Sequence, residues 1–192
     1  MTDTSLAAAT RDSAAQQPEA AAFSPPGLRE YAGLTVCLVA YGILLTWAAT
    51  RSGPVPQPEA ILGPVALQLG LTAAVWLLMV GFRNYSVLSG LISGEYFRAY
   101  QALHAPPDWV ERPARAFNNL MQVPTLFYLA CLFLVLFERL DHQAVLLGWI
   151  YASTRLLHAV AYIGWNYLPA RFGAWLASCV CLIVLWVRLL LG

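Results

Sequence analysis

Residues 143–165, QAVLLGWIYASTRLLHAVAYIGW, form an apolar stretch that is long enough to cross a bilayer as a helix. Arg155 stands near its middle, and no acidic residue lies in this or any other long apolar stretch to pair with it. A charged side chain at mid-bilayer costs about 3 kcal/mol on the mildest scale, so it is usually retained for function or for a packed partner. We expect Arg155 to mark a place where an anion binds.

The helical neighbours of Arg155 are also polar or aromatic. Tyr151, Arg155, His158, Tyr162 and Asn166 are spaced by four, three, four and four residues. This spacing predicts a single helix face that extends over roughly four turns. A lone histidine on such a face is more often a packing residue than a base, so His158 alone does not indicate catalysis.

Composition places the chain among the polytopic membrane proteins. Of its 192 residues, 59% are hydrophobic and 11% are charged, and the mean hydropathy is +0.61. Soluble domains are about one quarter charged. A net charge of +1 without a basic run gives no indication of a nucleic-acid partner. The histidines and cysteines show no metal-ligand spacing, so we expect no metal, and the four cysteines are expected to be buried and unpaired.

Five apolar stretches divide the chain, at about 31–50, 60–82, 114–137, 143–165 and 170–191. Each is long enough to span a hydrocarbon core of about 30 Å. They predict an all-α membrane protein, in which residues 58–192 form a four-helix transmembrane domain and residues 28–52 an extra transmembrane helix. Residues 1–27 are expected to be a disordered tail. A signal peptide is the alternative for the first stretch, but its apolar run is longer than a usual signal sequence contains.

Arginine counts predict the orientation of the chain. Placing the loop 83–113 in the cytoplasm puts seven arginines inside and three outside, namely Arg11, Arg29, Arg83, Arg98, Arg112, Arg115 and Arg171 against Arg51, Arg139 and Arg188. The chain contains no lysine, which favours a GC-rich bacterial genome and hence a bacterial inner membrane.

The third stretch begins with a polar strip. Arg115, Asn119 and Gln122 stand at i, i+4 and i+7 and share one helix face. Arginine offers a planar fork for a carboxylate, and the two amides suit a peptide-like ligand. The strip could equally join helices within the membrane, and both interpretations remain open.

Two further arginines stand at span ends on the same predicted side of the membrane, Arg83 after the second stretch and Arg171 at the start of the fifth. Each alone is typical of a side chain that reaches from the membrane to its surface. Together with Arg115 and Arg155 they predict a cationic pocket just inside the membrane.

Residues 60–192 resemble the MAPEG family, the membrane-associated proteins of eicosanoid and glutathione metabolism. Two motifs carry this resemblance. The third span matches the family's Arg-x-x-x-Asn-x-x-Glu strip and following proline with Arg115, Asn119, Gln122 and Pro124. The fourth span matches Arg-Leu-x-(Tyr or His)-x-x-x-Tyr with Arg155, Leu156, His158 and Tyr162.

The chain departs from the family pattern in four places, and one of them is Pro124, which stands one residue nearer to the strip than in the eicosanoid enzymes. Gln122 replaces a glutamate that receives the amino group of glutathione in members that use it, so a charge pair is lost. His158 stands where some members have tyrosine. The span at 31–50 has no counterpart in the four-helix family core.

The resemblance implies a homotrimer that holds glutathione between neighbouring subunits and acts as a transferase or peroxidase. Arg171, with Arg83 in reserve, would stabilise the glutathione thiolate. Arg115 would bind a carboxylate, Asn119 and Gln122 would fix the peptide, and His158 and Tyr162 would add hydrogen bonds. Arg155 would form the floor of the pocket and hold Asn119, Gln122 or backbone carbonyls of the third span.

The second substrate would be a lipophilic electrophile or hydroperoxide that enters from the membrane lipids. A non-catalytic member that binds a lipid or another membrane protein is the main alternative, and Gln122 favours it. A small transporter is a third class, but five spans without an inverted repeat argue against it.

Overall fold

The computed structural model describes residues 27–99 and 106–191. This part of the chain contains five long helices, each long and apolar enough to cross a membrane. They are α2 (Leu28–Ala49), α3 (Leu62–Leu88), α5 (Asp108–Leu136), α6 (His142–Ile163) and α7 (Leu168–Leu191). The short helices η1 (Pro58–Ile61) and α4 (Gly94–Ala99) lie between them. The predicted all-α membrane fold with one extra N-terminal helix is confirmed.

Two helices extend beyond their predicted bounds at the connection between α3 and α5. α3 continues past its predicted end to Leu88, because no glycine or proline occurs between Gly81 and Gly90, which has a positive φ of 72°. α5 begins at Asp108, directly after Pro106 and Pro107. The predicted loop at 83–113 is therefore too long, and two acidic residues of the first turn, Asp108 and Glu111, belong to α5.

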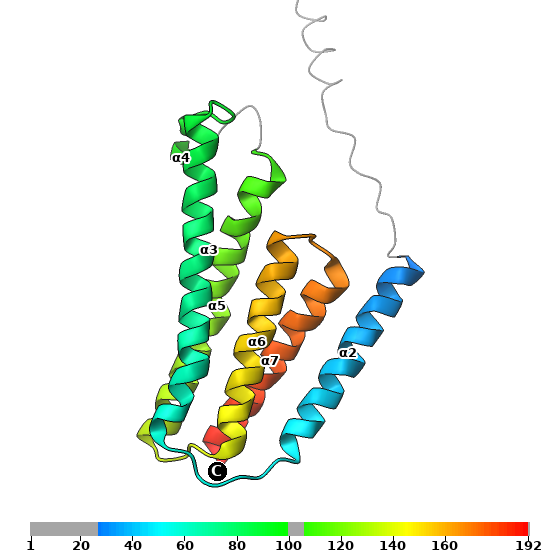
Figure 1. The fold of residues 1–192 in the computed structure, drawn as a ribbon, viewed down its shortest axis with the longest axis vertical. Coiled ribbons are helices and arrows are strands. Elements are labelled where there is room, and N and C mark those ends of the chain that lie inside the picture. Colours follow the sequence, from blue (N-terminus) through cyan, green and yellow to red (C-terminus); the bar gives the residue numbers. More distant parts are fainter. Residues whose placement is uncertain (1–26, 100–105, 192) are drawn as a thin grey trace, which may run out of the picture.

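The four C-terminal spans form an up-and-down bundle, in which α3 and α5 lie side by side and α6 packs against α7 (Figure 1). α6 also contacts α3 and α5, so it is the central helix of this part of the chain. α3 and α6 end where α5 and α7 begin. We call this end of the bundle, which carries Arg171, the Arg171 end.

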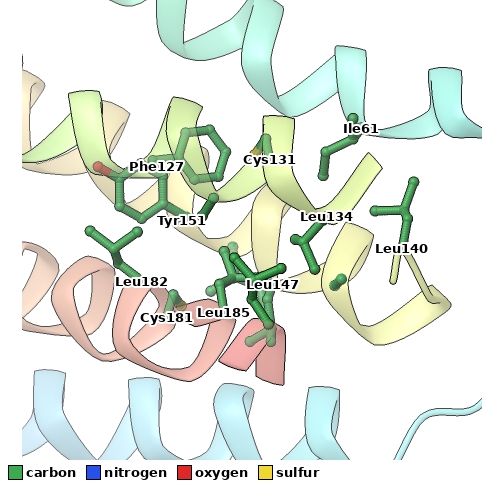
Figure 2. Packing of buried hydrophobic residues seen from close by; sticks show 14 of the residues in the cluster. Ile61, Phe127, Cys131, Leu134, Leu140, Leu147, Tyr151, Cys181, Leu182 and Leu185 are labelled. Carbon is green, nitrogen blue, oxygen red and sulfur yellow. The ribbon is translucent and has the colours of Figure 1, made fainter. Parts of the chain in front are cut away.

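The core is densest in the other half of the bundle. Phe127 of α5 stacks on Tyr151 of α6 with ring centroids 4.2 Å apart, and both side chains are fully buried (Figure 2). Leucines from α5, α6 and α7 complete this layer. Gly148 lets η1 and α3 approach α6, because a Cβ atom there would lie 3.2 Å from Ile61 and 3.3 Å from Pro64.

α2 packs against the outer side of α7 (Figure 1). It exposes most of its apolar surface, as expected for a helix that faces lipid. Its contact with α7 depends on glycines. A Cβ atom at Gly173 of α7 would lie 2.8 Å from Cys37 Cβ, and one at Gly33 would collide with the Tyr167 hydroxyl group. These glycines therefore bring the two helix backbones close together.

A polar contact fixes the C-terminal end of α2. The Gln143 amide nitrogen donates to the carbonyl oxygens of Ala49 (2.9 Å) and Arg51 (3.1 Å). Arg188 of α7 donates in turn to Gln143 Oε1 (2.7 Å) and forms an ion pair with Asp141. This network ties α2, α6 and α7 together at the end of the bundle opposite Arg171.

Candidate functional site

Arg155 lies fully buried on α6 and reaches across to α5. One guanidinium nitrogen, Nη2, donates to the side-chain oxygen of Asn119 and to its backbone carbonyl oxygen, the latter at 3.2 Å. Among the predicted acceptors, which were Asn119, Gln122 and backbone carbonyls of the third span, Arg155 contacts the side chain and the carbonyl of Asn119 and not Gln122. Its Nε and Nη1 atoms have no hydrogen-bond partner in the described part of the chain.

His158 stands one turn further along the same face of α6 and is also buried. Its Nδ1 atom lies 2.9 Å from the Arg171 carbonyl oxygen. A carbonyl oxygen can only accept, so Nδ1 carries the proton and donates. Nε2 has no partner among the described residues and, in this neutral tautomer, is an acceptor. His158 thus joins α6 to the first turn of α7 and keeps one free acceptor.

The Arg171 side chain is held at the start of α7. Its Nη1 atom donates to Asn166 Oδ1 at 2.6 Å, and its guanidinium carbon lies 4.4 Å from the centroid of the Tyr162 ring. No carboxylate of the described residues forms an ion pair with it. Its positive charge is therefore oriented by a neutral amide and an aromatic ring but is not neutralised.

The spacing predicted that Asn166 extends the polar face of α6. The structure shows that it does not. α6 ends at Ile163, and Asn166 lies in the connection to α7 with a positive φ of 51°. Asparagine tolerates this left-handed conformation better than most residues. Its backbone N–H bonds to the Ala161 carbonyl oxygen at 2.8 Å, and this turn directs the side chain to Arg171.

A cavity of about 310 Å³ brings together four of the predicted site residues. It is lined by Asn119, His158, Tyr162, Leu168, Arg171, Phe172 and Trp175. Arg155 supports this cavity indirectly, through Asn119. The arrangement combines one cation, one amide and an aromatic wall, which suits a polar anionic group next to an apolar one.

Arg115 and Gln122 do not line this cavity and are exposed on the surface of α5. Arg115 forms an ion pair with Asp108, which also pairs with Arg112. Arg112 donates further to the Gly164 carbonyl oxygen at 2.7 Å and so connects α5 to the end of α6.

Arg83 also has an acidic neighbour. The Arg83 Nη2 atom lies 3.9 Å from Glu111 Oε1 of α5. The Arg83 guanidinium carbon lies 5.1 Å from the centroid of the Phe97 ring. Of the four arginines predicted to form one cationic pocket, only Arg171 lines the cavity in the single chain. The early start of α5 supplies Arg83 and Arg115 with carboxylates, whereas Arg155 and Arg171 form no ion pair within the described residues.

Sequence reasoning missed the support that Asn166 gives to Arg171 and the aromatic wall of Phe172 and Trp175. The Gly-Trp-Asn sequence at 164–166 is a turn signal that could have placed Asn166 in a loop rather than on the helix. No group of three or more potential metal ligands occurs in residues 27–99 and 106–191.

Comparison with models of protein families matches residues 61–191 to the MAPEG family. The matched region begins at Ile61, the last residue of η1, and includes the four helices of the bundle. α2 lies before the matched region. No curated protein and no solved structure shows significant similarity to the chain.

Proposed function

The chain belongs to the MAPEG family, and we propose that it binds glutathione at the Arg171 cavity and activates its thiol for reaction with an apolar co-substrate. The single observation that carries this proposal is the Arg171 guanidinium. Arg171 lines the cavity, its guanidinium group is fixed by Asn166 and Tyr162, and it has no carboxylate partner in the described part of the chain.

The positive charge of Arg171 supplies the chemistry. A cation next to a thiol favours the thiolate over the thiol, and the thiolate is the nucleophile. The thiolate sulfur would attack an electrophilic carbon and form a thioether, while a leaving group departs with the electron pair of the broken bond or, at an activated double bond, the neighbouring carbon takes up a proton. With a hydroperoxide, two glutathione molecules would be oxidised to the disulfide while the hydroperoxide is reduced to an alcohol and water.

Asn119, His158 and Tyr162 would orient the bound glutathione. His158 and Asn119 both line the cavity, and Arg155 fixes the Asn119 side chain. Asn119 can still donate through its amide nitrogen, because the contact with Arg155 uses only its oxygen. This set suits the peptide groups of glutathione.

Arg115 and Gln122 would act across a subunit boundary. Both are exposed in the single chain, on the same side of α5 as Asn119. Proteins of this family commonly form trimers, and we assign this surface to the contact with a neighbouring subunit. The Arg115–Asp108 pair is half exposed and contributes little to stability, so a glutathione carboxylate can compete for Arg115.

The co-substrate would come from the bilayer. The five spans define a multi-pass membrane protein, and the cavity lies one turn from the start of α7, near the membrane surface. A water-soluble thiol and a lipid-soluble electrophile can both reach such a site. The arginine distribution supports a cytoplasmic position for the Arg171 end, in a bacterial inner membrane.

Equilibrium binding of glutathione to the purified protein tests this function. The wild type should bind glutathione and be stabilised by it, and Arg115→Ala should bind at least tenfold more weakly. Arg51→Ala, at the opposite end of the bundle, is the control and should bind as the wild type does. Absence of binding to the wild type would refute the proposal.

A non-catalytic member that binds a lipid or a protein is the second candidate. It is favoured by Gln122, a neutral residue where glutathione-using members carry glutamate, and by the Arg115–Asp108 ion pair. This candidate predicts that an apolar acid or lipid co-purifies with the protein and that Arg171→Ala leaves its binding unchanged.

A further inference from the structure

A second cavity, of about 190 Å³, lies between α2 and the first turns of α7. It is lined by Glu30, Tyr31, Leu34, Leu168, Pro169 and Phe172. Leu168 and Phe172 also line the cavity that contains Arg171. The two cavities therefore adjoin at Leu168 and Phe172.

The two cavities differ in chemistry. The Arg171 cavity presents a guanidinium group, an imidazole and an amide. The second cavity is walled mainly by apolar and aromatic side chains, and it contains no cation. Its one charged residue, Glu30, accepts from the Gly27 N–H at 3.2 Å and thereby caps α2. A polar group fits the first cavity, and an uncharged apolar chain fits the second.

α2 contacts the start of α7 where it forms this wall. Gly33 packs against Tyr167 and Pro169, and the Tyr167 hydroxyl group donates to the Arg29 carbonyl oxygen at 3.4 Å. The wall residues Tyr31 and Leu34 come from α2, which precedes the region matched to the family. This cavity is therefore an addition made by the extra helix.

We propose that the second cavity receives the apolar chain of the co-substrate while its reactive group lies beside Arg171. On this account α2 determines substrate specificity. Its residues Tyr31 and Leu34, together with Phe172 of α7, limit the length of the apolar chain that the cavity accepts. The co-substrate is then an amphiphile with one electrophilic or peroxidic end and one uncharged apolar chain. This inference rests on the proposed function, because it assumes that glutathione occupies the Arg171 cavity.

S-alkyl glutathiones test the inference without requiring catalysis. S-methyl, S-hexyl and S-decyl glutathione carry the same polar part and chains of increasing length. In the wild type, the Kd should fall at least tenfold from the S-methyl to the S-hexyl compound, because added methylene groups leave water for an apolar cavity. Leu34→Trp, which fills the cavity, should abolish this gain and leave the Kd of S-methyl glutathione within about twofold.

Leu38→Trp is the matched control. Leu38 lies one turn further along α2, is 39% exposed and does not line the cavity. This variant should keep the full gain with chain length, which excludes an effect of detergent or of the added tryptophan.

The outcomes separate this inference from the function on which it rests. If neither glutathione nor S-methyl glutathione binds the wild type, the proposed function fails and the inference fails with it. If both bind but affinity does not rise with chain length, or the rise persists in Leu34→Trp, only the inference is overturned. If Leu34→Trp also fails to bind S-methyl glutathione, the Leu34→Ala variant is measured instead. In Leu34→Ala the gain in affinity with chain length should extend to S-decyl glutathione. A dependence of Kd on chain length that is the same as in the wild type would contradict the inference.

Discussion

The guanidinium group of Arg155 on α6 holds both the side-chain oxygen and the backbone carbonyl oxygen of Asn119 on α5. Arg155 is fully buried, and Asn119 lines the cavity that contains Arg171. A charge buried in the membrane-spanning part thus fixes an amide that lines the cavity, and we propose that Arg155 positions this amide for the ligand.

A double-mutant cycle measures this contact. Arg155→Leu and Asn119→Leu should show a coupling of about 1.5–3 kcal/mol in the free energy of unfolding, the range for hydrogen bonds to charged groups. Gln122→Leu is the control partner on α5, since Gln122 is exposed, and its coupling to Arg155→Leu should stay within about 0.5 kcal/mol. Equal coupling in both cycles would contradict the positioning role.

A charge at position 122 should strengthen glutathione binding. Gln122→Glu restores the carboxylate that glutathione-using members carry, and its pairing with the ligand's amino group should lower the Kd about threefold to tenfold at neutral pH. The gain should vanish when the pH falls below about 4, where a glutamate is protonated.

Gln57→Glu serves as the control, because it adds the same charge at an exposed position at the other end of the bundle. A similar gain in this variant would indicate a general effect of net charge. No gain in Gln122→Glu would contradict the placement of the ligand's amino group.

The close contact of α2 with α7 should depend on Gly173. A Cβ atom at position 173 would lie 2.8 Å from Cys37 Cβ. The side chain that Gly173→Val adds therefore forces α2 to move away from α7. Maleimide labelling of Cys37, followed by mass spectrometry, should then become several-fold faster. Gly42→Val, on the free face of α2 with nothing within 4 Å, should label at the wild-type rate. If both variants label at that rate, α2 is not held by this contact.

The five spans were predictable from the sequence, because apolar runs of about 20 residues leave few alternatives to membrane helices. The Arg155–Asn119 contact was also predictable, since a buried guanidinium must find acceptors on a neighbouring helix. The ion pairs of Arg83 and Arg115 were missed, because they depend on α5 extending back to Asp108, and its first turn is not apolar.

The roles of Asn166 and α2 could not be obtained from helical spacing. α6 ends at Ile163, and Asn166 lies in the following connection with a positive φ, so its side chain reaches Arg171 from a loop. The position of α2 depends on side-chain packing at Gly33 and Gly173, which no periodicity encodes.

Thiolate formation by bound glutathione tests the central claim most directly. The ultraviolet absorbance of the thiolate should appear when glutathione saturates the wild type near neutral pH, and Arg171→Gln should abolish it and lower any turnover about 10²–10³-fold. Arg83→Gln should retain the thiolate, because Arg83 is already paired with Glu111. A thiolate signal that survives in Arg171→Gln, or disappears only in Arg83→Gln, would contradict the assignment of Arg171.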